Sequence, residues 1–125
     1  MRYFSVAIIS SVLSFAACGS SGGKASGKMT YANGGSTEAK SCKAFMRGTD
    51  MVAEIQMSDK SVLRIIKGTD TTYEYQNDKL TVDLKCSSQS TELQTLKTGD
   101  SPSVKGEIDL SRCMAIETIV LKLDC

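Results

Sequence analysis

Residues 80–86 read Leu-Thr-Val-Asp-Leu-Lys-Cys. Apolar and polar side chains alternate through this segment, which is the pattern of a β-strand with one buried and one exposed face. The same alternation recurs in residues 51–57 and 104–110, and turn-forming residues separate such segments at intervals of about eight to twelve residues. The pattern predicts a mainly β fold: a small antiparallel meander of about six to seven strands, folded as a barrel or a sandwich.

Two segments depart from simple alternation. Residues 114–123 are more continuously apolar and predict a strand that is covered on both faces. Residues 37–47 have a helical alternative, with an N-cap at Ser36 or Thr37 and a stop at Gly48. Helix and strand both stay open for this segment.

The N-terminus has the features of a targeting signal. Arg2 precedes an uncharged, mostly apolar run from Ser5 to Ala17. As a helix this run would span about 20 Å, against about 30 Å for the hydrocarbon core of a bilayer. The length therefore predicts that residues 1–17 are a signal peptide and not a membrane span.

Residues 15–20, Phe-Ala-Ala-Cys-Gly-Ser, resemble the lipobox of bacterial lipoproteins, in which small residues precede a cysteine; Phe15 stands where Leu is usual. The resemblance implies that Cys18 is lipidated with a diacylglycerol carrying acyl chains such as palmitate, and becomes the mature N-terminus. Two or three acyl chains would hold the protein on the membrane permanently. Because Gly19 follows the cysteine in place of aspartate, the resemblance favours the outer membrane of the cell envelope. The alternative is plain secretion, into the periplasm or beyond.

Residues 18–41 are rich in glycine and serine. Such a composition cannot bury enough surface to offset the entropy that is lost when a chain is ordered. We therefore expect a flexible tether over residues 18–41, followed by an all-β domain over residues 42–125. A short docked strand at residues 29–31 is the alternative within the tether.

Four of the five cysteines follow Cys18. In an exported domain four cysteines most often form two disulfides. The chain has no histidine and no Cys-x-x-Cys, so we expect no metal site. An extended strand over residues 114–124 would hold Cys113 and Cys125 about 40 Å apart, whereas a disulfide needs Cα atoms within about 7 Å. Alternating strand directions place Cys86 and Cys113 at the same end of the sheet, so the predicted pairs are Cys86–Cys113 and Cys42–Cys125.

The composition argues against several classes of function. Lys and Arg number 15 and Asp and Glu 14, a balance that disfavours a nucleic-acid partner. Without histidine a Ser-His-Asp or Cys-His arrangement cannot form, and the sequence contains no phosphate-binding loop, dinucleotide fingerprint or calcium loop. We therefore expect neither catalysis nor a cofactor.

Two classes of function remain. The first is a lipid-anchored binding or interaction module of the cell envelope, with an unknown envelope protein as partner; inhibition of a periplasmic hydrolase is one form of it. Small lipid-anchored lysozyme inhibitors are similar in having a disulfide-linked β-barrel, but their tryptophan-bearing motif is missing because the chain has no tryptophan. The second class is a carrier of a small apolar ligand in a barrel of lipocalin-like size, although the usual glycine–tryptophan signature is absent.

The two classes differ in what they require of the structure. A carrier needs a hollow interior with an apolar lining, whereas an interaction module needs a filled interior and an exposed apolar patch. Tyr73 and Tyr75 share one strand face and are the candidate contact patch, since tyrosine is favoured at interfaces. Cross-strand packing is the alternative role for both tyrosines.

Overall fold

The computed structural model describes residues 21–98 and 101–125. The regular structure of this part of the chain is entirely β. The strands are β2 (Ser21–Tyr31), β3 (Ser36–Arg47), β4 (Asp50–Met57), β5 (Val62–Lys67), β6 (Thr71–Gln76), β7 (Thr81–Leu84), β8 (Cys86–Thr98), β9 (Ser101–Cys113) and β10 (Ile116–Asp124). The predicted signal peptide and Cys18 lie outside the described residues. Among the residues that are described, no helix has the length and apolar character needed to cross a membrane.

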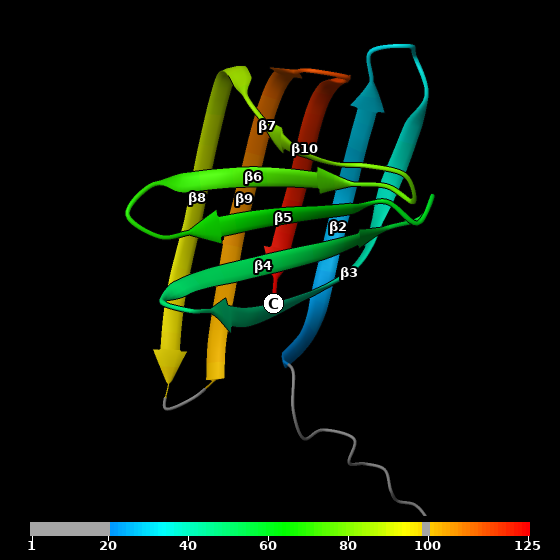
Figure 1. Ribbon diagram of the computed structural model, residues 1–125. Helices are drawn as coiled ribbons and strands as arrows, with labels where there is room; N and C mark the ends of the chain where they lie inside the picture. The colour runs from blue at the N-terminus through cyan, green and yellow to red at the C-terminus, as the bar shows by residue number, and fades with distance from the viewer. Residues whose placement is uncertain (1–20, 99–100) are drawn as a thin grey trace, which may run out of the picture.

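The nine strands form one antiparallel sheet, in the order β7-β6-β5-β4-β3-β2-β10-β9-β8. The sheet curls on itself into a nearly closed barrel: β4, β5 and β6 cross in front of β8, β9, β10 and β2 (Figure 1). The edge strands β7 and β8 are consecutive in the chain, with only Lys85 between them. A hydrogen bond of 2.9 Å between the hydroxyls of Tyr73 and Thr91 links β6 to β8 across the open side.

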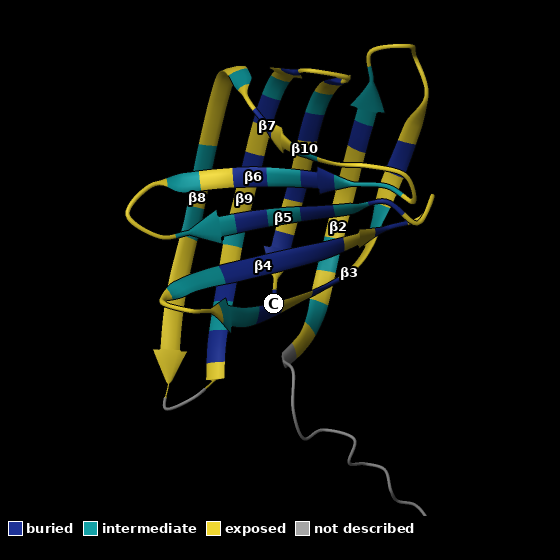
Figure 2. Ribbon diagram, in the orientation of Figure 1, coloured by how far each residue is buried: buried dark blue, intermediate teal, exposed yellow. Residues whose placement is uncertain are grey.

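Buried apolar side chains from both crossing layers form one core. Figure 2 shows buried residues along the strands of both layers. The alternation that predicts the fold is visible here, because Val82 is half-buried and Leu84 is buried against this core. Each large side chain removed from water stabilises the fold by about 1.5–3 kcal/mol relative to an exposed one. The largest fully buried side chains of the core include Met29, Ile55, Met57, Leu63, Ile65, Ile108, Leu110, Ile116, Ile119 and Leu121.

The flexible tether predicted for residues 18–41 is wrong from Ser21 onward. Strand β2 pairs with β10 on one side and with β3 on the other, so the folded domain begins about twenty residues before the predicted boundary. The glycines have a different role here from the one that composition suggested. Gly27 adopts a φ of +114°, and a Cβ on it would lie 2.1 Å from the carbonyl oxygen of Val120. Glycine at this position therefore permits a bulged strand to approach β10 closely.

Residues 37–47 form strand β3, which decides between the two alternatives for this segment. Thr37 is buried at an odd position, whereas Cys42 and Ala44 are buried at even positions. The change occurs at a register shift between Ala39 and Ser41. A bulge therefore moves the inward face by one residue. Inward-facing residues on the two sides of the bulge are then three positions apart in sequence, which is also the spacing of residues on one face of a helix. With β2 and β3 added, the sheet has nine described strands where about six to seven were expected.

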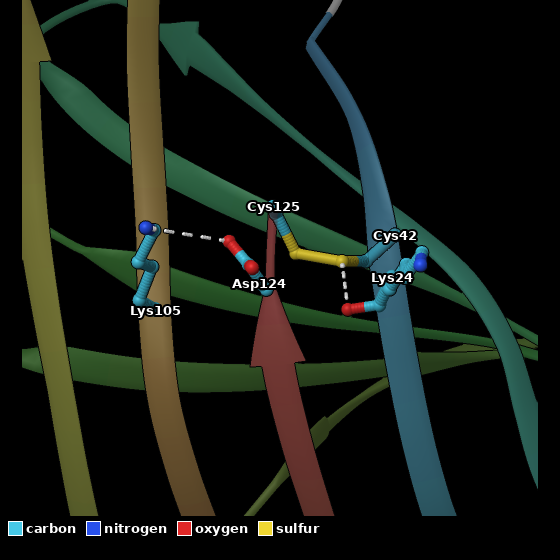
Figure 3. The surroundings of a disulfide bond; sticks show 5 residues. All are labelled: Lys24, Cys42, Lys105, Asp124 and Cys125. Carbon is cyan, nitrogen blue, oxygen red and sulfur yellow. Dashed lines mark hydrogen bonds and ion pairs between the residues drawn. A yellow bond between two sulfur atoms is a disulfide. The ribbon is translucent and has the colours of Figure 1, made fainter.

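Two disulfides link the strands, Cys42–Cys125 with 5.6 Å between the Cα atoms and Cys86–Cys113 with 4.1 Å. They are the two pairs that the strand directions predict. Cys86 and Cys113 stand directly opposite each other in the β8–β9 ladder. Cys125 follows the end of β10 and bonds Cys42 of β3, and β2 lies between these two strands in the sheet (Figure 3).

Candidate functional site

An apolar pocket of about 390 Å³ lies at the end of the barrel where β2 ends and β10 begins. One wall is formed by Val82 and Leu84 of β7, and the opposite wall by Ile116 and the turn that precedes it. These side chains come from segments that are distant in sequence and that the closure of the sheet brings together. The pocket is therefore a product of the fold and not of a local motif.

Two exposed apolar side chains form the rim of this pocket. Met114 belongs to the two-residue turn between β9 and β10, and its φ of 54° is the left-handed conformation that such turns require. Leu80 ends a turn in which Asn77 Oδ1 accepts a hydrogen bond of 2.9 Å from the Lys79 amide. Met114 is 62% exposed and Leu80 is 54% exposed. Tight turns thus hold both side chains in solvent beside the pocket.

A pair of tyrosines contributes the polar part of the lining. The rings of Tyr31 and Tyr75 meet edge to face with centroids 6.2 Å apart. Tyr31 donates a hydrogen bond of 2.5 Å to Asp59 Oδ2, so its oxygen accepts the 3.2 Å hydrogen bond from the Tyr75 hydroxyl. Asp59 Oδ1 accepts from the amide and the hydroxyl of Ser61, and the Asp59 amide donates to Thr37 Oγ1. This network fixes the tyrosine pair to the turn between β4 and β5.

The protonation states of the network follow from these contacts. Burial raises the pKa of Tyr31 above its ordinary value of 10.0, and the hydrogen bond to Asp59 raises it further. Burial also acts to raise the pKa of Asp59, but hydrogen bonds from Ser61 and Tyr31 outweigh it and hold that pKa below 3.8. At neutral pH Tyr31 is therefore a neutral phenol, and Asp59 behind it carries a charged carboxylate.

The candidate contact patch at Tyr73 and Tyr75 is wrong as an exposed surface. Tyr73 is 6% exposed and Tyr75 is 9% exposed, because the inward face of β6 is covered by the rear layer of the barrel. Both tyrosines have the packing role that was the alternative. Tyr75, but not Tyr73, lines the apolar pocket at the end of the barrel. The rim residues Leu80 and Met114 were missed, and their only sequence signal is an apolar residue placed within a turn.

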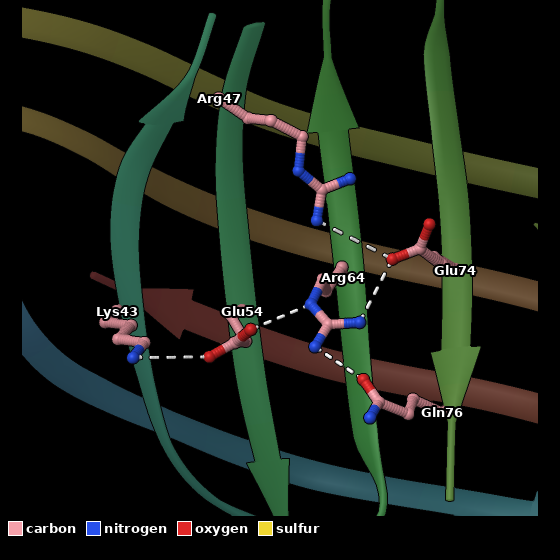
Figure 4. A network of polar contacts seen from close by, with 6 residues as sticks. All are labelled: Lys43, Arg47, Glu54, Arg64, Glu74 and Gln76. Atoms are coloured by element: carbon pink, nitrogen blue, oxygen red, sulfur yellow. Dashed lines mark hydrogen bonds and ion pairs between the residues drawn. The ribbon is translucent and has the colours of Figure 1, made fainter. Parts of the chain in front are cut away.

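A second polar cluster lies on the outer face of β3–β6 (Figure 4). Arg64 stands at its centre and bonds Glu54 at 2.8 Å, Glu74 at 3.0 Å and Gln76 at 2.6 Å. Although burial acts to lower the pKa of Arg64, its bonds to Glu54 and Glu74 outweigh burial and hold that pKa above its ordinary value. Each of the three guanidinium nitrogens donates a hydrogen bond to a residue of β4 or β6, the two strands beside β5. The cluster therefore links β4, β5 and β6 on the outer face of the barrel.

No known protein family, characterised protein or solved structure matches the chain. Within residues 21–98 and 101–125, no group of three or more His, Cys, Asp or Glu side chains could hold a metal ion. The pocket and the surface around it are therefore the features from which a function can be inferred.

Proposed function

We propose that this chain is a lipid-anchored, non-catalytic binding module of the bacterial cell envelope. The observation that carries the proposal is the apolar pocket with Leu80 and Met114 exposed at its rim. The lipobox resemblance at Cys18 supports the anchor, and two disulfides accord with an oxidising compartment such as the envelope. The site would act by contact and not by reaction.

The proposed occupant of the pocket is an apolar side chain of an envelope protein. A small ligand inside the pocket would leave the outward-pointing parts of Leu80 and Met114 in water. A partner protein would cover these rim side chains as well, and would place one anchor residue in the pocket, as in many protein interfaces. The flexible thioether of Met114 can adapt to such a partner. Inhibition of an envelope hydrolase is one form that this contact could take.

The filled interior weighs against the carrier as the first choice. A lipocalin-like carrier holds its ligand between the layers, and here that space is occupied by the buried core of β2, β4, β5, β9 and β10. A small apolar ligand remains the second candidate, but at the end of the barrel. It is favoured by the pocket volume of about 390 Å³, which lies at the lower end of the range for small-molecule sites, and by the two tyrosine hydroxyls beside it.

The test places a photo-reactive amino acid at Met114 in the full chain, expressed in its bacterial envelope. Val120 is the matched control, since it is also a large exposed apolar residue, at 53%, but lies on β10 away from the pocket lining. We expect one discrete protein adduct from position 114, none from position 120, and loss of the adduct when Leu80→Glu is added. Equal adducts from both positions, or no protein adduct at all, would reject the pocket as a protein contact. A small mass retained by the intact wild-type protein would favour the second candidate.

A further inference from the structure

The described chain enters the barrel at the end opposite the pocket. Strand β2 begins at Ser21 and runs to Tyr31, which lines the pocket, so the two ends of this strand mark the two ends of the molecule (Figure 1). Cys18 precedes Ser21 by three residues, which can span at most about 11 Å. A lipid anchor at Cys18 would therefore hold the first residues of β2 next to the bilayer surface. The inference below rests on the anchor of the proposed function.

The side chains at this end are rich in lysine. Gly22 lies opposite Lys43 in the β2–β3 ladder, and Asp124 lies between Lys24 and Lys105 in the ladders of β10. Figure 3 shows Lys24 and Lys105 on the two sides of the Cys42–Cys125 disulfide. Lys97 adds a charge close to the end of the β8–β9 hairpin, opposite Pro102. We call Lys24, Lys43, Lys97 and Lys105 the basic end.

The lysines of the basic end face solvent, although Lys43 also forms an ion pair of 3.4 Å with Glu54. All four are exposed. The ion pair between Lys105 and Asp124 measures 3.7 Å, with both side chains about two-thirds exposed, so water and salt screen it. Leu96, which is 62% exposed, lies beside Lys97 and supplies an apolar group of the kind that settles among lipid headgroups. The pocket end differs, because its turns mix Asp59 and Asp78 with Lys60 and Lys79.

We propose that the basic end rests on the anionic headgroups of a lipid bilayer. Attraction between lysines and an anionic surface is strong only within a Debye length of about 8–10 Å, and the short connection to the anchor keeps the basic end at that distance. Because β2 has 11 residues, it spans about 36 Å from this surface to the pocket. The same contact thus directs the pocket away from the membrane, towards the proteins that it is proposed to bind.

The test uses the full chain purified from the membrane fraction of a bacterial host and reconstituted into phosphatidylcholine vesicles, with or without phosphatidylglycerol. A membrane-impermeant, amine-reactive acylating reagent labels exposed lysines, and peptide mass spectrometry gives the rate at each position. Lys60 and Lys79 at the pocket end are internal controls. We expect Lys24, Lys97 and Lys105 to react several-fold more slowly than these controls on anionic vesicles, with the difference lost at high salt. Equal rates at the two ends would overturn the proposal.

Two matched variants separate a specific contact from general attraction. Lys97→Glu/Lys105→Glu and Lys60→Glu/Lys79→Glu change the net charge by the same amount at opposite ends. We expect the first variant to abolish the protection of Lys24 and the second to leave it intact; equal effects would overturn the proposal.

The intact mass of the purified chain distinguishes failure of this inference from failure of the proposed function. An acylated chain that begins at Cys18 and shows no lysine protection refutes only the membrane contact of the basic end. A chain without acyl mass refutes the anchor, and it also refutes the membrane contact, because that contact depends on the anchor.

Discussion

At the scale of single residues, Asp59 has more effect on the pocket than its position in a turn suggests. Its carboxylate accepts hydrogen bonds from Tyr31 and Ser61, and through Tyr31 it also orients Tyr75. The carboxylate is partly exposed, so solvent weakens each of these bonds. Its charge nevertheless makes Tyr31 a donor and leaves the Tyr31 oxygen as the acceptor for Tyr75.

We therefore expect Asp59→Asn to lower the free energy of unfolding by about 1 kcal/mol at pH 7, after allowance for solvent screening. The pKa of Asp59 is lower in the folded state than its ordinary value of 3.8. Its contribution is therefore complete above pH 3.8 and is lost as the pH falls through the folded pKa. Urea denaturation of both proteins between pH 7 and pH 2 should show the difference shrink as the pH falls below 3.8. Asp78→Asn, in the turn between β6 and β7, is the control. A difference that does not shrink as the pH is lowered below 3.8 would show that charge is not the cause.

Single residues also show how far alternation can be trusted. The pattern of residues 80–86 predicts that Leu80, Val82 and Leu84 face inward, and Val82 and Leu84 do. Leu80 has the same phase but is exposed, because the strand begins at Thr81 and Leu80 still belongs to the turn. Alternation assigns a face only within a strand. The rim of the pocket could therefore not be predicted without knowing where each strand begins.

At the scale of elements, β2 is the strand that the amino-acid composition did not predict. Its glycines predict flexibility when they are counted, but their effect depends on whether a partner strand approaches them. The Cβ of an alanine at Gly27 would lie 2.1 Å from Val120 O and 2.9 Å from Leu121 Cα. At Gly22 nothing lies within 4 Å. The two glycines differ in which strand lies against them: Gly27 lies opposite Leu121 of β10, whereas Gly22 lies opposite Lys43 of β3, beyond the end of the β2–β10 ladder. These neighbours are set by the whole sheet.

The two glycines provide a matched prediction. Gly27→Ala should lower the free energy of unfolding by at least about 2 kcal/mol, because it combines a backbone clash with a left-handed φ of +114°. Gly22→Ala should change it by less than about 0.5 kcal/mol, since the site is open and the substitution lies at the surface. Urea denaturation monitored by tyrosine fluorescence gives both values. Similar values for the two variants would mean that β2 is not docked on β10 as described, and would restore the tether as the better account.

At the scale of the whole molecule, the sequence predicts the connectivity better than the extent of the domain. Strand directions suffice to pair the cysteines, because a meander alternates its ends whatever the exact strand boundaries. The pairing of β2 with β10 on one side and β3 on the other is not predictable in the same way, because one strand must pair correctly along both of its edges. This pairing also places Cys125 close to the first strand that the structure describes: Cys125 bonds Cys42 of β3, and β2 lies between β3 and β10 in the sheet.

This arrangement predicts that the two disulfides differ in their contribution to stability. Cys42–Cys125 has a sequence separation of 83 and Cys86–Cys113 one of 27. Loop-closure entropy then gives about 4.5 kcal/mol for the first and about 3.5 kcal/mol for the second. We expect Cys42→Ser/Cys125→Ser to lose more stability in urea than Cys86→Ser/Cys113→Ser. We also expect amide exchange at residues 22–25 to accelerate only in the first variant, because that disulfide spans the start of β2. A greater loss in the second variant, with unchanged exchange at the start of β2 in the first, would show that the long closure does not hold the barrel together.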